Sequence, residues 1–498
     1  MSEQHLVQNM RNGYWRTYPI QVAERLGGNS FLRQNTLPLP FSFTQGCSRK
    51  LKSSLLGGSS RSLQNVTYSS TSRLVNELYH PEHDVENLEG YVPGGFHPTA
   101  IKDTFCDGRY KIVHKLGFGG YSTIWLARDQ IRQRFVSLKI LIASASRSSN
   151  EGSILCLLQN GNSSHPGRQF IPTLLDQFTF AGPNGQHLCL VGEPYGCSVS
   201  KSKEDNVDLM FPFKAARSVA AQLVMGLSYL HDCGICHGDL HMGNFLLRIP
   251  NFDSLTIAEL YDRFGKPYEV QVRRIDEKKP EPHAPAHVIY PMFPCLPSNE
   301  VTEPEIAISD YGTSFITSQT PSPTLHTPTL YAPPEDFFQE PITPVVDVWT
   351  LGVNLYEVLG ERPLFETLNW DKDDIIGEMV STLGRLPERW WDSWANRAEF
   401  FEQNGEWISD FKRISTPSFR PLRQRLWDMG RGETPEACKW DVAGGELQDL
   451  EDLLRGMMTF EPAERLTTKQ LMASRYMVKW GLPTWQSQRV KRGDQKTR

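Results

Sequence analysis

The chain has 498 residues, of which 39% are hydrophobic and 22% are charged, so it is long enough to bury a large core and still carry tails. It has no run of eighteen apolar residues and no secretory leader pattern, so we expect neither a membrane protein nor a secreted one. Its nine cysteines follow no regular spacing, which favours free thiols in a reducing compartment.

Residues 1–76 are basic and rich in serine, with nine Lys or Arg, two acids and twelve serines. This composition favours a disordered arm. Scarce acids and several arginines are also compatible with a mitochondrial transit segment, but no clean amphipathic helix is present. We therefore expect a cytoplasmic or nuclear protein, with mitochondrial targeting as the weaker alternative.

A strand predicted over residues 110–115 runs into a turn rich in glycine. Gly117 and Gly119 allow backbone to approach a phosphate closely, and Ser122 stands where a third glycine is usual. Taken alone, the turn is also compatible with an ordinary β-hairpin. The candidate nucleotide-binding residues are Leu116, Gly117, Phe118, Gly119, Gly120, Tyr121, Ser122, Thr123 and Ile124.

A second apolar strand, residues 135–139, ends in Lys139, which is placed to hold nucleotide phosphates. Glu151 opens a segment with Ile154, Leu155 and Leu158 at helical spacing. We therefore expect Glu151 to face inward and pair with Lys139, the alternative being a solvated surface glutamate.

The segment from Cys236 to Asn244 has the pattern H-x-D-x-x-x-x-N. Asp239 in such a loop can accept the proton of an attacking hydroxyl, and the amide oxygen of Asn244 can ligate Mg²⁺. Residues 306–308 form a predicted strand that closes on Asp310, Tyr311 and Gly312, so Asp310 is the second candidate metal ligand.

Three further motifs follow downstream. Residues 331–335 end in Glu335, and residues 347–352 open as a buried helix with an acid at its start. Arg465 is the expected buried partner of Glu335. The order of these motifs makes coincidence an inadequate explanation.

The motifs from the glycine turn to Arg465 resemble the eukaryotic protein kinase family. The resemblance implies an α+β bilobal fold, with a small β-rich N-lobe and a larger α-helical C-lobe. Within the family the chain is similar to SR protein kinases, which are CMGC-type serine/threonine kinases. The segments that carry this closer resemblance are residues 91–98, 107–110, 121–126, 384–387 and 400–401, together with the 66-residue spacing from Asn244 to Asp310.

The resemblance implies a leader over residues 77–108, the N-lobe and hinge over 109–196, and the C-lobe over 197–485. A spacer insert, residues 250–304, interrupts the C-lobe, and residues 486–498 form a basic tail. The spacer is rich in proline and has no sustained period, so we interpret most of it as mobile.

The resemblance also implies ATP and Mg²⁺ as cofactors and transfer of the γ-phosphate to Ser or Thr of basic proteins, with Arg/Ser-rich splicing-type proteins as candidates. The implied catalytic residues are Asp239, Lys139, Glu151, Asn244 and His241, and the metal ligands are Asn244 and Asp310. Glu193 and Tyr195 of the hinge are expected to pair with adenine, and Gly192 falls at the gatekeeper position. We expect a monomer that does not bind nucleic acid directly.

The chain departs from the family at three positions. His241 replaces a lysine that steadies the transferring phosphate, and Pro328, flanked by Thr327 and Thr329, replaces a threonine that bridges the catalytic aspartate and that lysine. Gly238 replaces the arginine that often neutralises a loop phosphate, so we expect activity without phosphorylation.

Two other functions therefore stay open. The first is a pseudokinase that acts as a nucleotide-binding scaffold. The second is a small-molecule phosphotransferase, because H-G-D-L-H-x-G-N resembles aminoglycoside and choline kinases. The downstream motifs argue against the second.

Cys233, Cys236 and His237 have the spacing of a haem attachment site, but packing is the favoured interpretation because they follow a predicted helix with leucines in register.

The formal net charge is unevenly distributed along the chain. The basic arm, residues 1–76, contributes +7 and the tail, residues 486–498, contributes +4, which leaves −16 for the residues between them. An acidic body suits basic substrates. Asp374 matches an acidic docking position, whereas Ser381 falls where a glutamate is expected, and an ordinary acidic surface is the alternative.

Overall fold

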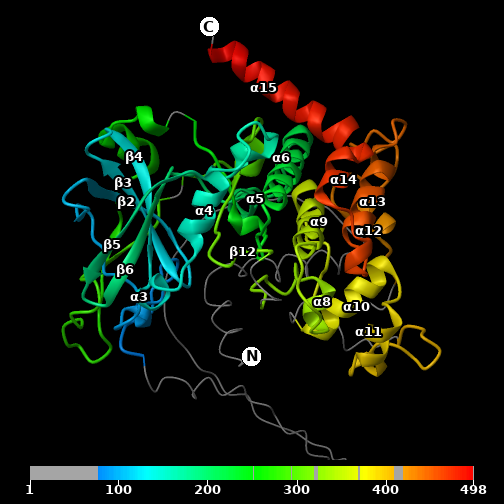
Figure 1. Cartoon of the computed structure of the whole chain (residues 1–498), viewed down its shortest axis with the longest axis horizontal. Coiled ribbons are helices and arrows are strands. Elements are labelled where there is room, and N and C mark those ends of the chain that lie inside the picture. Colours follow the sequence, from blue (N-terminus) through cyan, green and yellow to red (C-terminus); the bar gives the residue numbers. More distant parts are fainter. Residues whose placement is uncertain are drawn as a thin grey trace, which may run out of the picture.

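The computed structural model describes residues 77–250, 252–292, 294–318, 324–367, 371–408 and 419–496. They form a β-rich lobe and a helical lobe that lie side by side (Figure 1). The predicted bilobal fold is therefore confirmed. The predicted basic arm, residues 1–76, lies outside the described residues.

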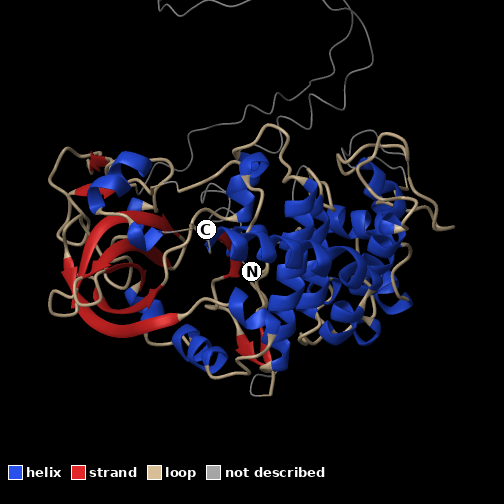
Figure 2. Ribbon diagram, turned by 90° about the horizontal axis from the view of Figure 1, so that it is seen from above, coloured by secondary structure: helices blue, strands red, loops and turns tan. Residues whose placement is uncertain are grey.

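The N-lobe is built on an antiparallel sheet of six strands in the order β1-β2-β3-β4-β6-β5, which curls on itself (Figure 2). Alternating apolar residues fill its inner face, where Tyr110, Trp125 and Leu138 are at most 1% exposed. The six strands are β1 (Thr104–Phe105), β2 (Tyr110–Phe118), β3 (Ser122–Asp129), β4 (Arg134–Leu141), β5 (Leu174–Gly182) and β6 (Gly185–Gly192).

Helix α4 (Glu151–Gln159) lies between this sheet and the C-lobe (Figure 1). Its residues Ile154, Leu155 and Leu158 belong to the same buried cluster as the apolar residues of α6 (Phe213–Asp232), as their spacing predicts. The helix is preceded by the short α3 (Ala143–Ser146). Helix α4 thus presents its N-terminal Glu151 to the space between the lobes.

The C-lobe packs around α6 and α9 (Val346–Leu359), and every residue of α9 is buried. Two short antiparallel pairs, β7 with β12 and β8 with β11, lie beside α6. Helix α15 crosses the top of the lobe (Figure 1) and includes the first part of the basic tail. The remaining helices are α5 (Val199–Glu204), α8 (Pro334–Phe337), α10 (Lys372–Leu383), α11 (Glu388–Ser393), α12 (Leu422–Asp428), α13 (Glu446–Met457), α14 (Thr468–Ala473) and α15 (Leu482–Lys496). The short strands are β7 (Ile235–Cys236), β8 (Phe245–Leu247), β11 (Ile306–Ile308) and β12 (Phe315–Ile316).

The spacer, residues 250–304, differs from the mobile segment we expected. Thr256 and Glu259 form a capping box that starts α7 (Ile257–Phe264), and β9 (Glu269–Gln271) pairs with β10 (His287–Ile289). Its apolar residues are buried against the N-lobe strands. In α7 the apolar residues Leu260, Tyr261 and Phe264 recur at helical spacing, a local signal that our interpretation missed, whereas Met292 packs from far along the chain. The buried contacts are those of Phe252, Leu260 and Met292 with Val113, Leu126 and Phe135.

The leader packs on the same insert. Tyr79, Tyr91 and Phe96 share a buried cluster with Val272 and Val288 of the insert. Beneath them the ammonium of Lys115 contacts the carboxylate of Glu86, and both side chains are almost completely buried. Buried contacts thus join the leader to the insert and the insert to the sheet.

Cys197 and Cys295 form a disulfide, with Cα atoms 5.1 Å apart, at positions separated by 98 in sequence. This differs from the free thiols that the cysteine spacing favoured, because a pair this distant leaves no local motif. The other cysteines in the described ranges are free: Cys106, Cys156, Cys189, Cys233, Cys236 and Cys438. Within the same ranges, no helix is long and apolar enough to cross a membrane.

Glu335 and Arg465 form the predicted ion pair, with two contacts of 2.6 Å between side chains that are 0% exposed. Glu335→Ala leaves the guanidinium buried without its anion, so we expect the free energy of unfolding to fall by about 3–5 kcal/mol. The matched control is Glu388→Ala, which breaks an exposed pair with Arg385 and is expected to cost at most about 1 kcal/mol. Urea denaturation followed by fluorescence measures the free energy of unfolding of each variant. Equal decreases for the two variants would contradict the assignment of a buried ion pair between Glu335 and Arg465.

Candidate active site

Lys139, at the inner end of β4, joins the two lobes. Its ammonium donates to both carboxylate oxygens of Glu151 at 2.8 Å and to Oδ1 of Asp310 at 2.9 Å. Burial alone would lower the pKa of Lys139, but the carboxylates of Asp310 and Glu151 outweigh it and raise the pKa. In turn Lys139 lowers the pKa of Asp310 to about 2. The expected pairing of Lys139 with Glu151 is present, and Asp310 is held charged beside it.

The glycine turn connects β2 to β3, and Leu116–Ile124 spans the end of one strand, the turn and the start of the next. A Cβ added at Gly117 or Gly119 would meet no atom within 4 Å, so the turn leaves open space where a phosphate can approach. Gly119 N donates to the carbonyl of Ser122 at 2.8 Å, which closes the turn. Thr123 is fully buried, and its hydroxyl accepts from the indole of Trp125.

Asp347, the first acid of α9, fixes the backbone of the catalytic loop. Its carboxylate accepts from the amides of His237 at 2.7 Å and Gly238 at 2.9 Å, and lies 3.1 Å from Nε2 of His231. Gly238 has φ of +75°, a conformation that a side chain at the usual arginine position would strain. The sequence marked Asp347 only as a buried helix start.

His237 is held as a neutral ring. Its Nε2 lies 3.0 Å from the carbonyl of Ser309, and its Nδ1 accepts from the amide of Asp239 at 3.3 Å. Burial lowers the pKa of this imidazole. His237 therefore acts as a spacer between the catalytic loop and the segment that carries Asp310.

Asp239 and Asn244 lie together on this loop. Asn244 donates through Nδ2 to the carbonyl of Asp239 at 2.9 Å, which turns its amide oxygen the other way. Oδ1 of Asp239 is buried and has no hydrogen-bond partner among the described residues. Burial, and then the charge of Asp310, raises the pKa of Asp239. A buried carboxylate oxygen without a donor fits a group that receives a proton from a bound hydroxyl.

His241 stands where the family has lysine. Nδ1 accepts from the amide of Gly243 at 3.1 Å, so the neutral ring carries its proton on Nε2, which is 3.8 Å from Oδ2 of Asp239. Burial lowers the pKa of His241 to about 4. At pH 7 the ring therefore offers a hydrogen-bond donor and no charge.

The activation segment, which runs from Asp310 to Glu335, contacts the catalytic loop through a different residue from the one we expected. Thr327, one position before Pro328, donates its hydroxyl to the carbonyl of Gly238 at 3.0 Å. Ser314 donates to the carbonyl of His237 at 3.0 Å, and β12 pairs with β7. A neighbouring threonine thus ties the segment to the backbone of the catalytic loop, although its partner is the Gly238 carbonyl and not the Asp239 side chain, and no spacing rule in the sequence predicts this contact.

The hinge, residues 193–196, connects β6 to the C-lobe. The carbonyl of Glu193 accepts from the hydroxyl of Ser137 at 3.0 Å, and the Glu193 carboxylate pairs with Arg248 at 2.8 Å. The guanidinium of Arg248 lies 5.1 Å from the centroid of the Tyr195 ring. Glu193 and Tyr195, both predicted to meet adenine, are therefore held in place by the same arginine.

Comparison with known proteins agrees with this geometry. The model of the protein kinase domain matches residues 110–261 and 297–477, which together make up more than half of the chain. The chain belongs to the protein kinase family. The gap between the two matched ranges contains the β9–β10 hairpin of the insert.

The relatives of this kinase narrow the family further. It is 26% identical to protein kinase dsk1 of Schizosaccharomyces pombe, over 80% of this chain and 86% of that protein. It is 29% identical to a serine/threonine-protein kinase SRPK of Physarum polycephalum, over 79% of this chain and 91% of that protein. A 170-residue stretch is 36% identical to human SRSF protein kinase 3 and covers 33% of this chain and 30% of that protein. The chain is thus a serine/threonine protein kinase of the SR protein kinase type.

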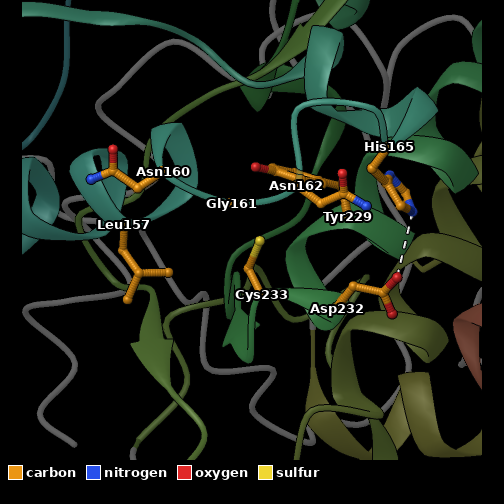
Figure 3. Close-up of a pocket in the computed structure, with 8 residues that line it drawn as sticks. All are labelled: Leu157, Asn160, Gly161, Asn162, His165, Tyr229, Asp232 and Cys233. Carbon is orange, nitrogen blue, oxygen red and sulfur yellow. Dashed lines mark ion pairs between the residues drawn. The ribbon is translucent and has the colours of Figure 1, made fainter.

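A separate cavity of about 440 Å³ lies between the end of α4 and the end of α6 (Figure 3). Nε2 of His165 lies 3.5 Å from Oδ2 of Asp232 at its rim, and the sulfur of Cys233 points into the cavity. Burial raises the pKa of both the Cys233 and the Cys236 thiol, which disfavours the thiolate form that metal binding requires. The lining residues are Leu157, Asn160, Gly161, Asn162, His165, Tyr229, Asp232 and Cys233.

The predicted docking acid, Asp374, lies in the first turn of α10 beside two further acids whose side chains are engaged in hydrogen bonds. Asp371 caps the helix, and Asp373 accepts from the indole of Trp394 at 2.6 Å. Asp374 is 8% exposed, and Ser381, where a glutamate was expected, accepts from the amide of Arg420. Asp374 is therefore poorly placed to meet a substrate directly. Trp370 lies outside the described residues.

Gly192 leads to a prediction about inhibitors. A Cβ at this position would lie 3.2 Å from the hydroxyl of Ser137, so any side chain must displace that hydroxyl. We expect Gly192→Phe to weaken a bulky inhibitor of the adenine pocket by about tenfold or more. The inhibition constant is measured for the double variant Gly192→Phe/Ser137→Ala, in which the clash is relieved, and for Ser137→Ala alone as the control. Equal inhibition constants for the double variant and the control would refute the gatekeeper assignment.

Proposed function

We propose that this kinase depends on ATP and Mg²⁺ and phosphorylates Ser or Thr of basic proteins, with Arg/Ser-rich splicing-type proteins as the candidate class. The observation that carries the proposal is the contact of Lys139 with both Glu151 and Asp310, next to a buried Asp239 oxygen that has no donor in the described part of the chain. These groups match the phosphate, metal and base positions that phosphoryl transfer requires.

ATP supplies the transferred phosphoryl group, and Mg²⁺ neutralises charge on its phosphates. Asn244, through its amide oxygen, and Asp310, through its carboxylate, would hold the metal. Lys139 would bind the phosphates, oriented by Glu151. Asp239 would take the proton of the substrate hydroxyl on its unpartnered Oδ1.

The nucleotide would lie under the glycine turn, Leu116–Ile124, because Gly117 and Gly119 face open space. The Glu193 carbonyl and the Tyr195 amide would pair with adenine. Ser137 already donates to that carbonyl, and a carbonyl oxygen has two lone pairs, so one remains for adenine.

His241 would donate a hydrogen bond from Nε2 where related kinases place a charged lysine. Together with Thr327, which ties the activation segment to the backbone of the catalytic loop, it supports turnover over a pseudokinase role. The contacts of Ser314 and Thr327 hold the segment without an arginine at Gly238, so we propose activity that needs no phosphorylation of the segment.

The substrate class rests on two supports. Similar proteins are named as SR-type kinases, and the body of the chain carries −16 against its basic ends. Such a field attracts basic peptides over several ångströms without a single docking residue. We also propose that the kinase acts as a monomer in the cytoplasm or nucleus, on protein and not on nucleic acid.

Asp239→Asn keeps the size of the side chain and removes its basicity. We expect transfer of labelled phosphate to an Arg/Ser-repeat peptide to fall by about 10²–10⁴-fold. The matched control is Asp232→Asn, an acid of the separate cavity, which is expected to leave transfer unchanged. Chelation of Mg²⁺ is expected to abolish transfer by the wild type. Nucleotide binding without any transfer would favour the pseudokinase instead.

Thr327→Val removes the hydroxyl that bonds to the Gly238 carbonyl, while Thr329→Val changes a neighbour in the same way. Because a lost hydrogen bond is worth about 1 kcal/mol, we expect kcat to fall by about three- to tenfold in the first variant only. Steady-state kinetics before and after phosphatase treatment measure both variants. A fall in kcat for Thr329→Val as large as the fall for Thr327→Val would contradict the proposed role of the Thr327 hydroxyl.

A further inference from the structure

The disulfide lies at the junction of hinge and insert. Cys197 immediately follows the hinge, and Cys295 comes from the last part of the insert. Both residues are partly exposed, and the neighbouring Leu296 is 51% exposed. A small thiol or peroxide can therefore reach the sulfur atoms from solvent.

The insert connects this disulfide to the N-lobe. The amide of Met292 donates to the carbonyl of Lys115 at 2.8 Å, directly before the glycine turn. Three positions later Cys295 is bonded to Cys197. The end of the insert is thus a short strap from strand β2 to the hinge.

The hinge is held from both sides at this point. The amide of Cys197 donates to the carbonyl of Pro294 at 3.4 Å, and a Cβ on Gly196 would lie 2.9 Å from the same carbonyl. On the other side the amide of Gly196 donates to the carbonyl of Leu247 at 2.8 Å. Only the disulfide ties the strap covalently to this arrangement.

We propose that Cys197 and Cys295 form a reversible thiol–disulfide site that sets how firmly the insert holds the hinge. In the oxidised form the strap fixes the distance between the glycine turn and the hinge. In the reduced form no covalent link holds its end, which keeps the bond from the Cys197 amide to Pro294 and the bond from the Ser202 hydroxyl to the carbonyl of Leu296 at 2.7 Å, so the hinge moves more freely.

The chemistry balances with common reagents. A dithiol reductant gives two electrons and two protons to the disulfide, which becomes two thiols while the reductant closes its own sulfur–sulfur bond. In the reverse direction a hydroperoxide takes two electrons and two protons from the thiols. Its oxygen–oxygen bond breaks to give an alcohol and water, and the Cys197–Cys295 bond forms.

The consequence for nucleotide binding rests on the proposed function. A hinge and glycine turn that are already fixed lose less conformational freedom when a nucleotide binds, so the oxidised form binds more tightly. We expect the dissociation constant for ADP to rise by about three- to tenfold on reduction.

The experiment uses the full chain, oxidised with hydrogen peroxide or reduced with dithiothreitol. Peptide mapping by mass spectrometry detects the link between Cys197 and Cys295. Hydrogen exchange over residues 192–197 and 288–296 reports hinge and strap, and calorimetry measures ADP binding. Reduction is expected to speed exchange in both peptides and weaken binding, and Cys197→Ser/Cys295→Ser is expected to match the reduced protein under both conditions.

The control is Cys156→Ser, which removes an exposed free cysteine and is expected to keep the full redox response. Absence of the link after peroxide, or equal exchange and equal binding in both forms, overturns the proposal. If no form binds ADP, the proposed function fails, and exchange alone then decides the redox site: a difference confined to the wild type and Cys156→Ser supports it, and no difference overturns it.

Discussion

The site depends on the carboxylate of Asp347, which is 1% exposed at the start of the fully buried helix α9. A buried charge is stable only when donors surround it, and here the donors are the amides of His237 and Gly238 together with the ring of His231. Satisfying this carboxylate therefore fixes the path of the catalytic loop. The same constraint selects glycine at position 238, because the loop turns there with positive φ.

The insert gives the fold a second constraint that the two lobes alone would not have. It packs Phe252 and Leu260 on the outside of the N-lobe sheet and ends at the hinge. The hinge is normally the place where two lobes move against each other. In this chain it lies between the C-lobe strand that contains Leu247 and a strap fixed to the N-lobe. The hinge region thus contacts Pro294 and Cys295, which lie outside the regions matched by the family model.

Much of this was predictable from sequence because it is local or ordered along the chain. Glu151 has apolar partners at helical spacing, and the pairs Lys139–Glu151 and Glu335–Arg465 follow from the order of motifs. Other features depend on partners far away in sequence. The contact of Thr327 with the Gly238 carbonyl comes one residue before the expected position, and the insert packs on N-lobe residues that are distant in sequence. The cysteine link and the burial of Asp374 are likewise set by tertiary contacts, which no spacing pattern records.

The electrostatics of the six motif residues explain why the site suits a metal. Glu151, Asp239 and Asp310 are carboxylates, Asn244 is an amide, and His241 is neutral, so Lys139 supplies the only positive charge within this set. Many protein kinases have a further lysine at the position of His241 and an arginine at the position of Gly238, although SR protein kinases also lack that arginine. Their absence here leaves Asp239 near the charge of Asp310, which contributes to its raised pKa. A divalent cation held by Asn244 and Asp310 would offset that charge, lower the pKa of the base and replace part of the missing positive charge where phosphate must bind. His241 can then be neutral, since its remaining task is to direct one hydrogen bond.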